Sequence, residues 1–279
     1  MTPLRKLTLF ALALVAVTAA AAAVGAAVEP TGLSTVEPDE GGHGGGMEEG
    51  MVPGLAAAED DFRLVPETDQ ITRATSTTYR FRVEREDEVV TEFDIEHTKP
   101  MHVIVVRRDF VGFQHLHPEM RPDGTWETDL TIEDAGAYRV FADFVVGGDK
   151  HTLATDLFVG GDFAPQPLPA PERIADAGDG YTVELIGDAV VGEESTLEFV
   201  VRHDGEVVDD LAEYLGARGH LVALRDGDLG YLHVHADEDR LSFEADFPTR
   251  GAYRLFLQFQ HGGEVRTAEL TIDAAEETR

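Results

Sequence analysis

The chain has 279 residues, of which 43% are hydrophobic and 8% aromatic, enough apolar material for one or two globular domains. It carries 54 acidic residues against 22 Lys and Arg, and the net charge of -32 argues against nucleic acid or anionic lipid headgroups as partners. It contains no cysteine, which excludes disulfides, thiolate metal sites, cysteine nucleophiles and a lipid anchor on cysteine.

The first 28 residues form a targeting segment. Arg5 and Lys6 give it a short cationic start, and an apolar stretch of about 22 residues from 7 to 28 follows, long enough to span a bilayer. Small residues such as Ala21 and Ala23 are typical of a signal-peptide cleavage site. We expect residues 1–28 to be a removed signal peptide or a membrane anchor. Both place the rest of the chain outside the cytoplasm, secreted or in the cell envelope, and only residues 7–28 would touch a membrane.

Residues 29–60 are predicted to be a flexible tether. Gly and Glu dominate this segment, and its apolar residues show no period that a helix or strand would require. His43, Met47 and Met51 could contact a soft metal ion transiently, but their surroundings indicate a solvated linker.

Two similar halves follow, at residues 61–159 and 180–273, and this repeat decides the architecture. The string from Gly136 to Phe141, GAYRVF, recurs as GAYRLF from Gly251 to Phe256. Residues 160–179 between the halves are rich in proline and predict a semi-rigid linker, and residues 274–279 form a short tail.

Within each half the apolar residues recur with a period of two. Tyr79, Phe81 and Val83 alternate with charged residues, as in a strand with one buried face. Gly-containing turn signals follow every 8 to 12 residues, and no helical periodicity is present after residue 60. The segment Asp134 to Tyr138 resembles the tyrosine corner of immunoglobulin-like domains, although the Cys pair of true immunoglobulins is absent. The sequence predicts an all-β protein with two tandem immunoglobulin-like β-sandwich domains.

Histidines recur at equivalent places in the two halves. Each half contains one histidine before an apolar run and an H-x-H motif after it, so that two antiparallel strands joined by a turn bring three imidazoles to one face. In the second copy we expect a two-residue turn on Gly227 and Asp228. A duplicated fold alone would preserve apolar positions and turns rather than three polar rings. The predicted metal ligands are His102, His115, His117, His220, His233 and His235.

Three imidazoles on one face suit Cu(II), Zn(II) or Ni(II), and we expect copper or zinc. The sequence does not identify the fourth ligand. Candidates in the first half are water, Met101, Glu119, His97 and His151, and in the second half water, Glu238 and His261. Because each half has its own triad and the linker is rich in proline, the sequence predicts two separate sites. Binding should weaken as the pH falls through about 6.5, where a free imidazole is protonated.

One resemblance rests on the string from Pro100 to Asp109 (PMHVIVVRRD), on FQHLHP from Phe113 to Pro118, and on GAYRVFADF from Gly136 to Phe144. These segments resemble a family of secreted or envelope bacterial proteins that is loosely associated with copper and heavy-metal handling. The resemblance implies an exported, duplicated β-domain protein with a metal role. The second half departs from the pattern, with Gly219 in place of the Met and Ala236 in place of the last Pro.

Three functions compete on these observations. The first is an exported, non-catalytic protein that binds copper or zinc through a three-histidine hairpin site in each half. The second is a structural or interaction protein whose histidines are ordinary and whose domains present surfaces to another envelope protein. The third is an enzyme, since three histidines on adjacent strands resemble the zinc ligands of β-sheet lyases. Without a Ser nucleophile motif or an evident proton shuttle, we expect no enzymatic activity.

Overall fold

The computed structural model describes residues 52–232, 234–237 and 240–276. The targeting segment and most of the tether, including His43, Met47 and Met51, lie outside the described residues, as do His233 and the side chain of His235. All the described residues belong to one compact unit, Glu49–Arg279. Every regular element in the described residues is a strand. These residues contain no helix that is long and apolar enough to cross a membrane.

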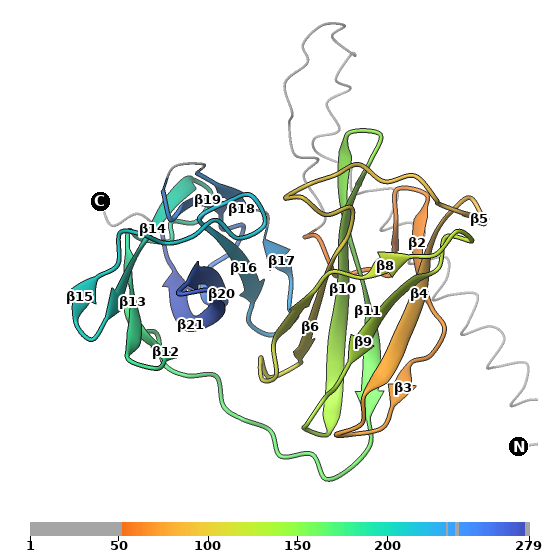
Figure 1. Ribbon diagram of the computed structural model, residues 1–279, viewed down its shortest axis with the longest axis horizontal. Coiled ribbons are helices and arrows are strands. Elements are labelled where there is room, and N and C mark those ends of the chain that lie inside the picture. Colours follow the sequence, from red (N-terminus) through yellow and green to blue (C-terminus); the bar gives the residue numbers. More distant parts are fainter. Residues whose placement is uncertain (1–51, 233, 238–239, 277–279) are drawn as a thin grey trace, which may run out of the picture. The chain divides into compact units, whose positions relative to one another are not determined.

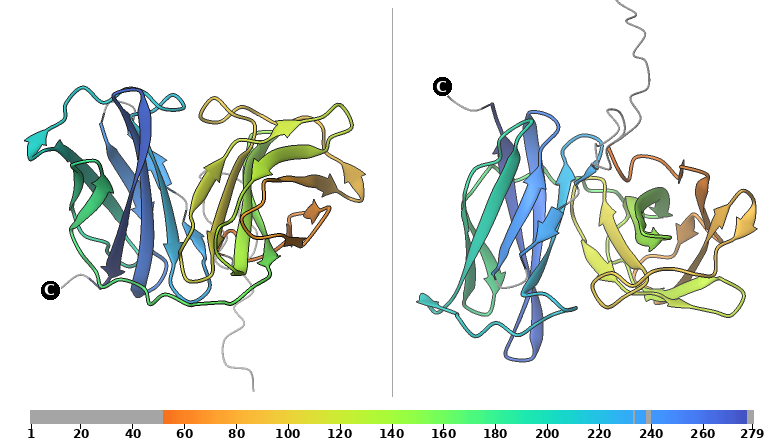
Figure 2. Two further views of the ribbon diagram at one scale, coloured as in Figure 1. Left: turned by 60° about the horizontal axis from the view of Figure 1, so that its bottom comes forward. Right: turned by 90° about the horizontal axis from the view of Figure 1, so that it is seen from above.

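The first half folds into two layered sheets (Figures 1 and 2). One sheet has the order β1-β2-β4-β9-β8, with β5 paired to β4, and the other has the order β3-β11-β10-β6-β7. The strands are β1 (Ala58–Glu59), β2 (Phe62–Pro66), β3 (Gln70–Ile71), β4 (Thr77–Arg85), β5 (Glu88–Val89), β6 (His102–Arg107), β7 (Gln114–Leu116), β8 (Glu119–Met120), β9 (Trp126–Leu130), β10 (Gly136–Val146) and β11 (Asp149–Val159).

The second half repeats this arrangement with one sheet of order β12-β13-β14-β19-β18, with β15 paired to β14, and another of order β17-β16-β20-β21. Its strands are β12 (Ile174–Gly178), β13 (Tyr181–Ile186), β14 (Glu194–His203), β15 (Glu206–Val207), β16 (Gly219–Arg225), β17 (Tyr231–Leu232), β18 (Val234–Ala236), β19 (Ser242–Asp246), β20 (Gly251–His261) and β21 (Glu264–Ala274).

The strand order identifies the sandwich type. An immunoglobulin-like domain places its strands A, B, E and D on one sheet and its strands C, F and G on the other. In the first half, the order β2, β4, β9 and β8 corresponds to strands A, B, E and D. The order β6, β10 and β11 corresponds to strands C, F and G. The short β3 pairs with β11 in parallel, while its sheet is otherwise antiparallel. The predicted fold class, two tandem immunoglobulin-like sandwiches, is confirmed.

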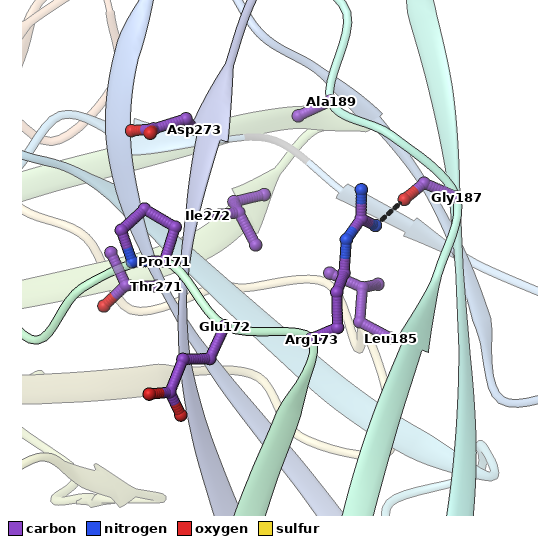
Figure 3. Close-up of a pocket in the computed structure, with 9 residues that line it drawn as sticks. All are labelled: Pro171, Glu172, Arg173, Leu185, Gly187, Ala189, Thr271, Ile272 and Asp273. Carbon is purple, nitrogen blue, oxygen red and sulfur yellow. Dashed lines mark hydrogen bonds between the residues drawn. The ribbon is translucent and has the colours of Figure 1, made fainter.

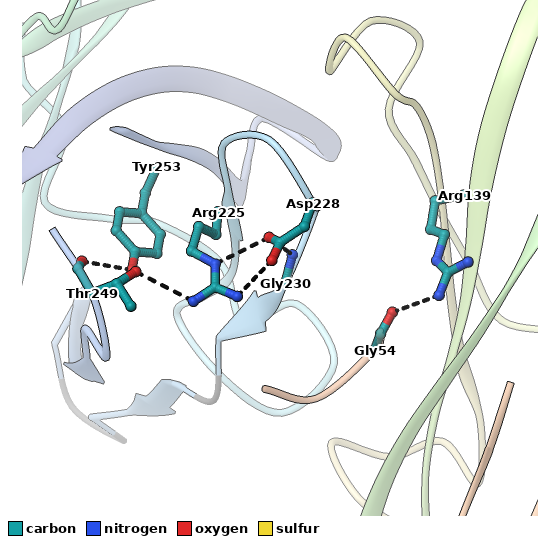
Figure 4. Close-up of polar contacts among 7 residues, drawn as sticks. All are labelled: Gly54, Arg139, Arg225, Asp228, Gly230, Thr249 and Tyr253. Carbon is teal, nitrogen blue, oxygen red and sulfur yellow. Dashed lines mark hydrogen bonds and ion pairs between the residues drawn. The ribbon is translucent and has the colours of Figure 1, made fainter. Parts of the chain in front are cut away.

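Both tyrosine corners are present. The hydroxyl of Tyr138 donates to the carbonyl of Asp134 at 2.9 Å. That of Tyr253 donates to the carbonyl of Thr249 at 2.9 Å (Figure 4). The second corner forms without the Asp of the sequence pattern, because the acceptor is a backbone carbonyl that any residue supplies.

The turn predicted on Gly227 and Asp228 is wrong, and the register that it implied holds only next to the loop, since the backbone of His235 pairs with Glu244 instead of lying opposite His220. Ala223 pairs with Leu232 and Leu224 with Tyr231, but a longer loop connects these strands. Asp228 shapes this loop, since its carboxylate accepts from the Arg225 guanidinium at 2.6 Å and from the Gly230 amide at 3.0 Å (Figure 4). A side chain that holds two donors in this way favours an irregular loop over a tight two-residue turn.

The sandwiches pack against each other through the outer faces of their β6–β10 and β16–β20 sheets. Alternate residues of these strands fill the sandwich cores, and those between them form a separate buried cluster that joins both halves. We call this the interface cluster: Ile104, Val106, Phe110, Phe141, Ala154, Val222, Leu224, Leu229, Tyr231 and Phe256. At its edge the ring of Phe113 stacks on Phe256, with centroids 4.1 Å apart.

The proline-rich linker, which the sequence predicts to be semi-rigid, does not keep the halves apart. Residues 160–173 of the linker have no regular secondary structure and run from β11 to β12 along the side of both sandwiches (Figure 1). The last residues that the sequence assigned to the linker form β12 and pair with β13. The prolines of the linker stiffen the chain but leave free the outer sheet faces, whose apolar side chains gain from burial against each other.

The tyrosine corners provide a stability test. We expect Tyr138→Phe and Tyr253→Phe each to lower the free energy of unfolding by about 1 kcal/mol, because each removes a partly buried hydrogen bond to a backbone carbonyl. Urea denaturation of the two variants measures this change. Tyr79→Phe is the control, since the Tyr79 hydroxyl makes no side-chain hydrogen bond to any described residue; an equal loss in all three variants would contradict the role of the corners.

Candidate metal centre

The hairpin of β6 and β7 gathers the three histidines of the first half. Val103 pairs with Leu116 and Ile104 with His115, and this register continues to place His102 opposite His117, as predicted. Because residues two apart share a face, all three rings lie on the face of Ile104, which belongs to the interface cluster. Each ring offers one nitrogen, and these nitrogens lie within 4.8 Å of one another.

Hydrogen bonds to neighbouring groups orient two of these rings. The Nε2–H of His102 donates to the carbonyl of Glu96 at 3.1 Å. The Nδ1 of His115 lies 2.8 Å from the Oε1 of Gln258, a residue of the second sandwich, whose amide nitrogen donates to the Thr267 hydroxyl at 3.2 Å. Two carbonyl oxygens, which only accept, therefore fix the outward-facing nitrogens as N–H groups.

The remaining nitrogens of these two rings face each other. Nδ1 of His102 lies 3.0 Å from Nε2 of His115, and with the outward nitrogens protonated both inner nitrogens carry lone pairs. Two neutral imidazoles in these tautomers cannot hydrogen-bond to each other. A cation between them removes the conflict. The alternative is a reversed Gln258 amide, which would donate to His115 and let the His115 Nε2–H donate to His102.

His117 supplies the third nitrogen. Its Nε2 is buried and has no hydrogen-bond partner among the described residues. A buried polar atom without a partner is rare in a native protein and often marks the place of an ion or water. His117 therefore points to the same kind of ligand as the facing nitrogens of His102 and His115.

Burial keeps these imidazoles neutral. Desolvation, followed by the proximity of His102 and His117, lowers the pKa of His115 to about 3. Desolvation likewise lowers the pKa of His117 to about 4 and that of His220 to about 4, and it lowers the pKa of His102. Neutral imidazole is the form that binds a metal. Protons should therefore compete with a metal only well below the pH of about 6.5 that a free histidine would indicate.

His220 lies beside the first-half cluster rather than apart from it. Its ring centroid is 6.3 Å from that of His102, 6.1 Å from that of His115 and 5.0 Å from that of His97. Strand β17 pairs with β16 only as far as Leu232. The next strand, β18, pairs with β19 of the other sheet, and this pairing places the backbone of His235 opposite Glu244. The two expected sites therefore do not appear as two separated hairpin triads among the described residues. The triad of His220, His233 and His235 remains a prediction.

The other candidate ligands of the sequence analysis mostly lie elsewhere. Met101 is buried in the first core, and Glu119 is exposed on β8. The ring of His151 packs on Phe62, with centroids 4.4 Å apart, and His261 is bonded to the Tyr181 hydroxyl at 2.7 Å. Glu238 lies outside the described residues. Only His97 is near the cluster.

Gln258 is the functional residue that the sequence analysis did not identify. It occupies β20 directly opposite His220, and it is the one polar side chain within the apolar run from Leu255 to Phe259. Its equivalent in the first half is Asp143, which lies opposite His102 on β10 and accepts from the Thr152 hydroxyl at 2.7 Å. A polar residue at the same place in both runs was the available signal.

The cluster borders a small cavity of about 50 Å³ that is lined by residues of both sandwiches. It is lined by His97, His102, His115, Asp143, Lys150, His220, Leu221, Val222, Tyr231, Val234, Ala236 and Phe243. Lys150 is paired with Glu96 at 2.9 Å and Asp143 at 3.3 Å. The cavity has room for an ion with a water, since one water occupies about 30 Å³ of liquid.

A second pocket of about 230 Å³ lies where the linker joins the second sandwich (Figure 3). Its guanidinium group, on Arg173, is already bonded to the Gly187 carbonyl and the Asp188 carboxylate. The polar groups of this pocket do not converge on a common point as the histidines do.

Comparison with known proteins supports the repeat. The family model described as "Domain of unknown function (DUF8832)" matches residues 57–161 and again residues 175–276. The chain belongs to this family. Two copies of the DUF8832 domain thus follow one another in the chain, which confirms the internal repeat. The family description assigns no function, and no curated protein matches the sequence.

Several solved structures are similar to this DUF8832 protein at low identity. The Escherichia coli adhesin FdeC has 12% identity and a TM-score of 0.27, with 79% of this chain and 66% of that chain covered. An Escherichia coli alpha-2-macroglobulin has 15% identity and a TM-score of 0.28, with 77% of this chain and 20% of that chain covered. Invasin, a bacterial integrin-binding protein, has 14% identity and a TM-score of 0.21, with 77% of this chain and 39% of that chain covered. The chain spans less than two thirds of the length of each.

The lowered histidine pKa values predict a pH-dependent stability of the metal-free protein. Below pH 6.5 the unfolded chain protonates histidines that the folded chain keeps neutral, so the free energy of unfolding should fall as the pH drops from 7 to 5. His115 alone accounts for up to about 1.4 kcal/mol per pH unit. Urea denaturation with a chelator at several pH values measures this slope. His115→Ala should flatten it more than His203→Ala, which removes a half-exposed ring outside the cluster; a slope unchanged by His115→Ala would contradict the assignment.

Proposed function

We propose that this DUF8832 protein is an exported metal-binding protein that holds a Cu(II) or Zn(II) ion on His102, His115 and His117. The observation that carries the proposal is the convergence of three inner nitrogens, two of which face each other at 3.0 Å while the third lacks a partner. Export rests on the cationic and apolar pattern of residues 1–28.

The chemistry of the ligands favours these two metals. Neutral imidazole binds copper and zinc well, and copper more tightly at a given site. With no cysteine in the chain, a blue-copper centre is excluded. The ring nitrogens that point away from the ion donate to oxygens of Glu96 and Gln258, which is the arrangement that orients metal-bound histidines in proteins.

The size of the cavity favours ion binding over catalysis. A space of about 50 Å³ admits an ion and a water but is far below the roughly 300 Å³ at which small-molecule pockets begin. The carboxylate that lines the cavity, on Asp143, already accepts from the Thr152 hydroxyl and is paired with Lys150. A non-catalytic binding protein is therefore the function that the site supports best.

Metal binding is tested by equilibrium dialysis and calorimetry with Cu(II) and Zn(II) on protein purified without a His tag. We expect micromolar or tighter binding at pH 7.5 and a loss of at least about 100-fold in His115→Ala/His117→Ala, because two of three ligands are removed. The control His151→Ala/His203→Ala removes two imidazoles outside the cluster and should bind as the wild type does. Retention of neither ion by the wild type would leave a structural or interaction role as the better explanation.

The orientation of Gln258 gives a second test. If its oxygen accepts from His115, Gln258→Glu keeps an acceptor there and should bind the ion at least as tightly, while Gln258→Leu should bind about tenfold more weakly, the usual cost of losing an outer hydrogen-bond partner. Calorimetry compares the two variants with the wild type. Weaker binding by Gln258→Glu than by Gln258→Leu would contradict this orientation and favour the reversed amide.

A further inference from the structure

We infer that the ion is shared between the two sandwiches, with His220 of the second sandwich as its fourth ligand, so that metal binding clamps the two domains together. This inference rests on the proposed function of the three first-half histidines and adds the ligand and the mechanical consequence that the sequence did not predict.

The first argument is that His220 is oriented in the same way as His102. The Nε2–H of His220 donates to the carbonyl of Tyr214 at 2.9 Å, just as that of His102 donates to the carbonyl of Glu96. The Nδ1 of His220 therefore carries a lone pair, and it accepts no hydrogen bond from any described residue. In both repeats the acceptor carbonyl lies in the short turn that precedes the strand.

The second argument is distance. A ring that binds a metal at 2.0–2.1 Å has its centroid about 3.2 Å from the ion, so at the tetrahedral angle two rings on one ion have centroids about 5.2 Å apart. The first-half rings fit this spacing, with His102 and His115 at 5.3 Å, His102 and His117 at 5.0 Å, and His115 and His117 at 4.6 Å. His220 lies 6.3 Å from His102 and 6.1 Å from His115, and its nitrogens are not part of the group that lies within 4.8 Å. His220 therefore joins the ion only if its ring moves inward by about 1 Å.

The third argument concerns His97, which we assign as a positioning residue. Its ring packs edge-to-face on His220, with centroids 5.0 Å apart. His97 and Thr98 form the centre of a two-residue turn with φ values of 47° and 66°. The equivalent turn of the second repeat uses Leu215 and Gly216, where glycine adopts such a conformation without strain. His97 thus lies against His220 on a turn whose conformation the second repeat shares, since Leu215 has a φ of 54° at the position of His97.

The fourth argument is that the second sandwich already orients a first-half ligand. Gln258, opposite His220 on β20, contacts the Nδ1 of His115 at 2.8 Å. The interface cluster fixes the two sheets beside this contact, and the cavity is lined from both halves. The ligand geometry of such a site depends on how the two sandwiches are docked. The geometry of a triad on a single hairpin would not depend on the docking.

The experiment combines zinc affinity with a distance between the sandwiches. The chain lacks cysteine, so Glu88→Cys on β5 and Glu206→Cys on β15, both exposed, accept one nitroxide label in each domain. Leu229→Ala, in the interface cluster but away from the histidines, loosens the docking so that a clamp becomes visible. Pulsed electron–electron double resonance then measures the label distances with and without Zn(II), which is diamagnetic.

We expect zinc to narrow the distance distribution of the labelled protein, and His220→Ala to abolish the narrowing and weaken zinc binding by at least about tenfold. His203→Ala, which removes an imidazole of the same sandwich outside the cluster, should behave as the wild type does. Zinc binding that is unchanged in His220→Ala, or zinc binding without narrowing, would overturn the shared site and leave the three-histidine proposal standing. No zinc or copper binding by the wild type would instead overturn the proposed function.

Discussion

The contact on which the site depends is the apolar packing between two sheets that belong to different sandwiches. In a single immunoglobulin-like domain one face of each sheet fills the core and the other faces water. Here the second face of β6 and β10 is also apolar, and it is buried against the same face of β16 and β20. The hairpin of β6 and β7 carries its histidines at the edge of this face, so the interface removes water from one side of their rings.

This loss of water explains the chemistry of the cluster. A protonated imidazole is costly in such surroundings, and the lowered pKa values of His115 and His117 follow mainly from burial. The neutral rings then need donors and acceptors in fixed places, and the carbonyl of Glu96 and the amide of Gln258 supply acceptors for two of them. The nitrogens left over point at one another. The packing of the sheets therefore keeps the rings neutral, the acceptors fix their tautomers, and the tautomers determine which nitrogens are left to bind a ligand.

Much of this could be predicted from the sequence. Period-two patterns at Tyr79 to Val83, repeated motifs and the tyrosine corner were sufficient for two sandwiches, because these signals are local. Hairpin register is also local, and it brought His102, His115 and His117 together correctly. The docking of the sandwiches was not predicted, since it depends on pairing between distant faces. Its signal was the unbroken apolar run of β6, which indicates a strand buried on both sides.

The two repeats differ in the residues that lie opposite and beside their first histidines. Asp143 and Lys150 of the first sandwich form a charged pair at positions that Gln258 and Val265 occupy in the second. The uncharged Gln258 can accept from His115 without adding a negative charge to a buried site, whereas the charge of Asp143 requires Lys150 beside it. Duplication thus supplied two copies of one histidine-bearing sheet. With Gln258 on the opposing strand, the first sandwich supplies three clustered imidazoles and the second supplies the group that orients one of them, His115, an arrangement that neither sandwich provides alone.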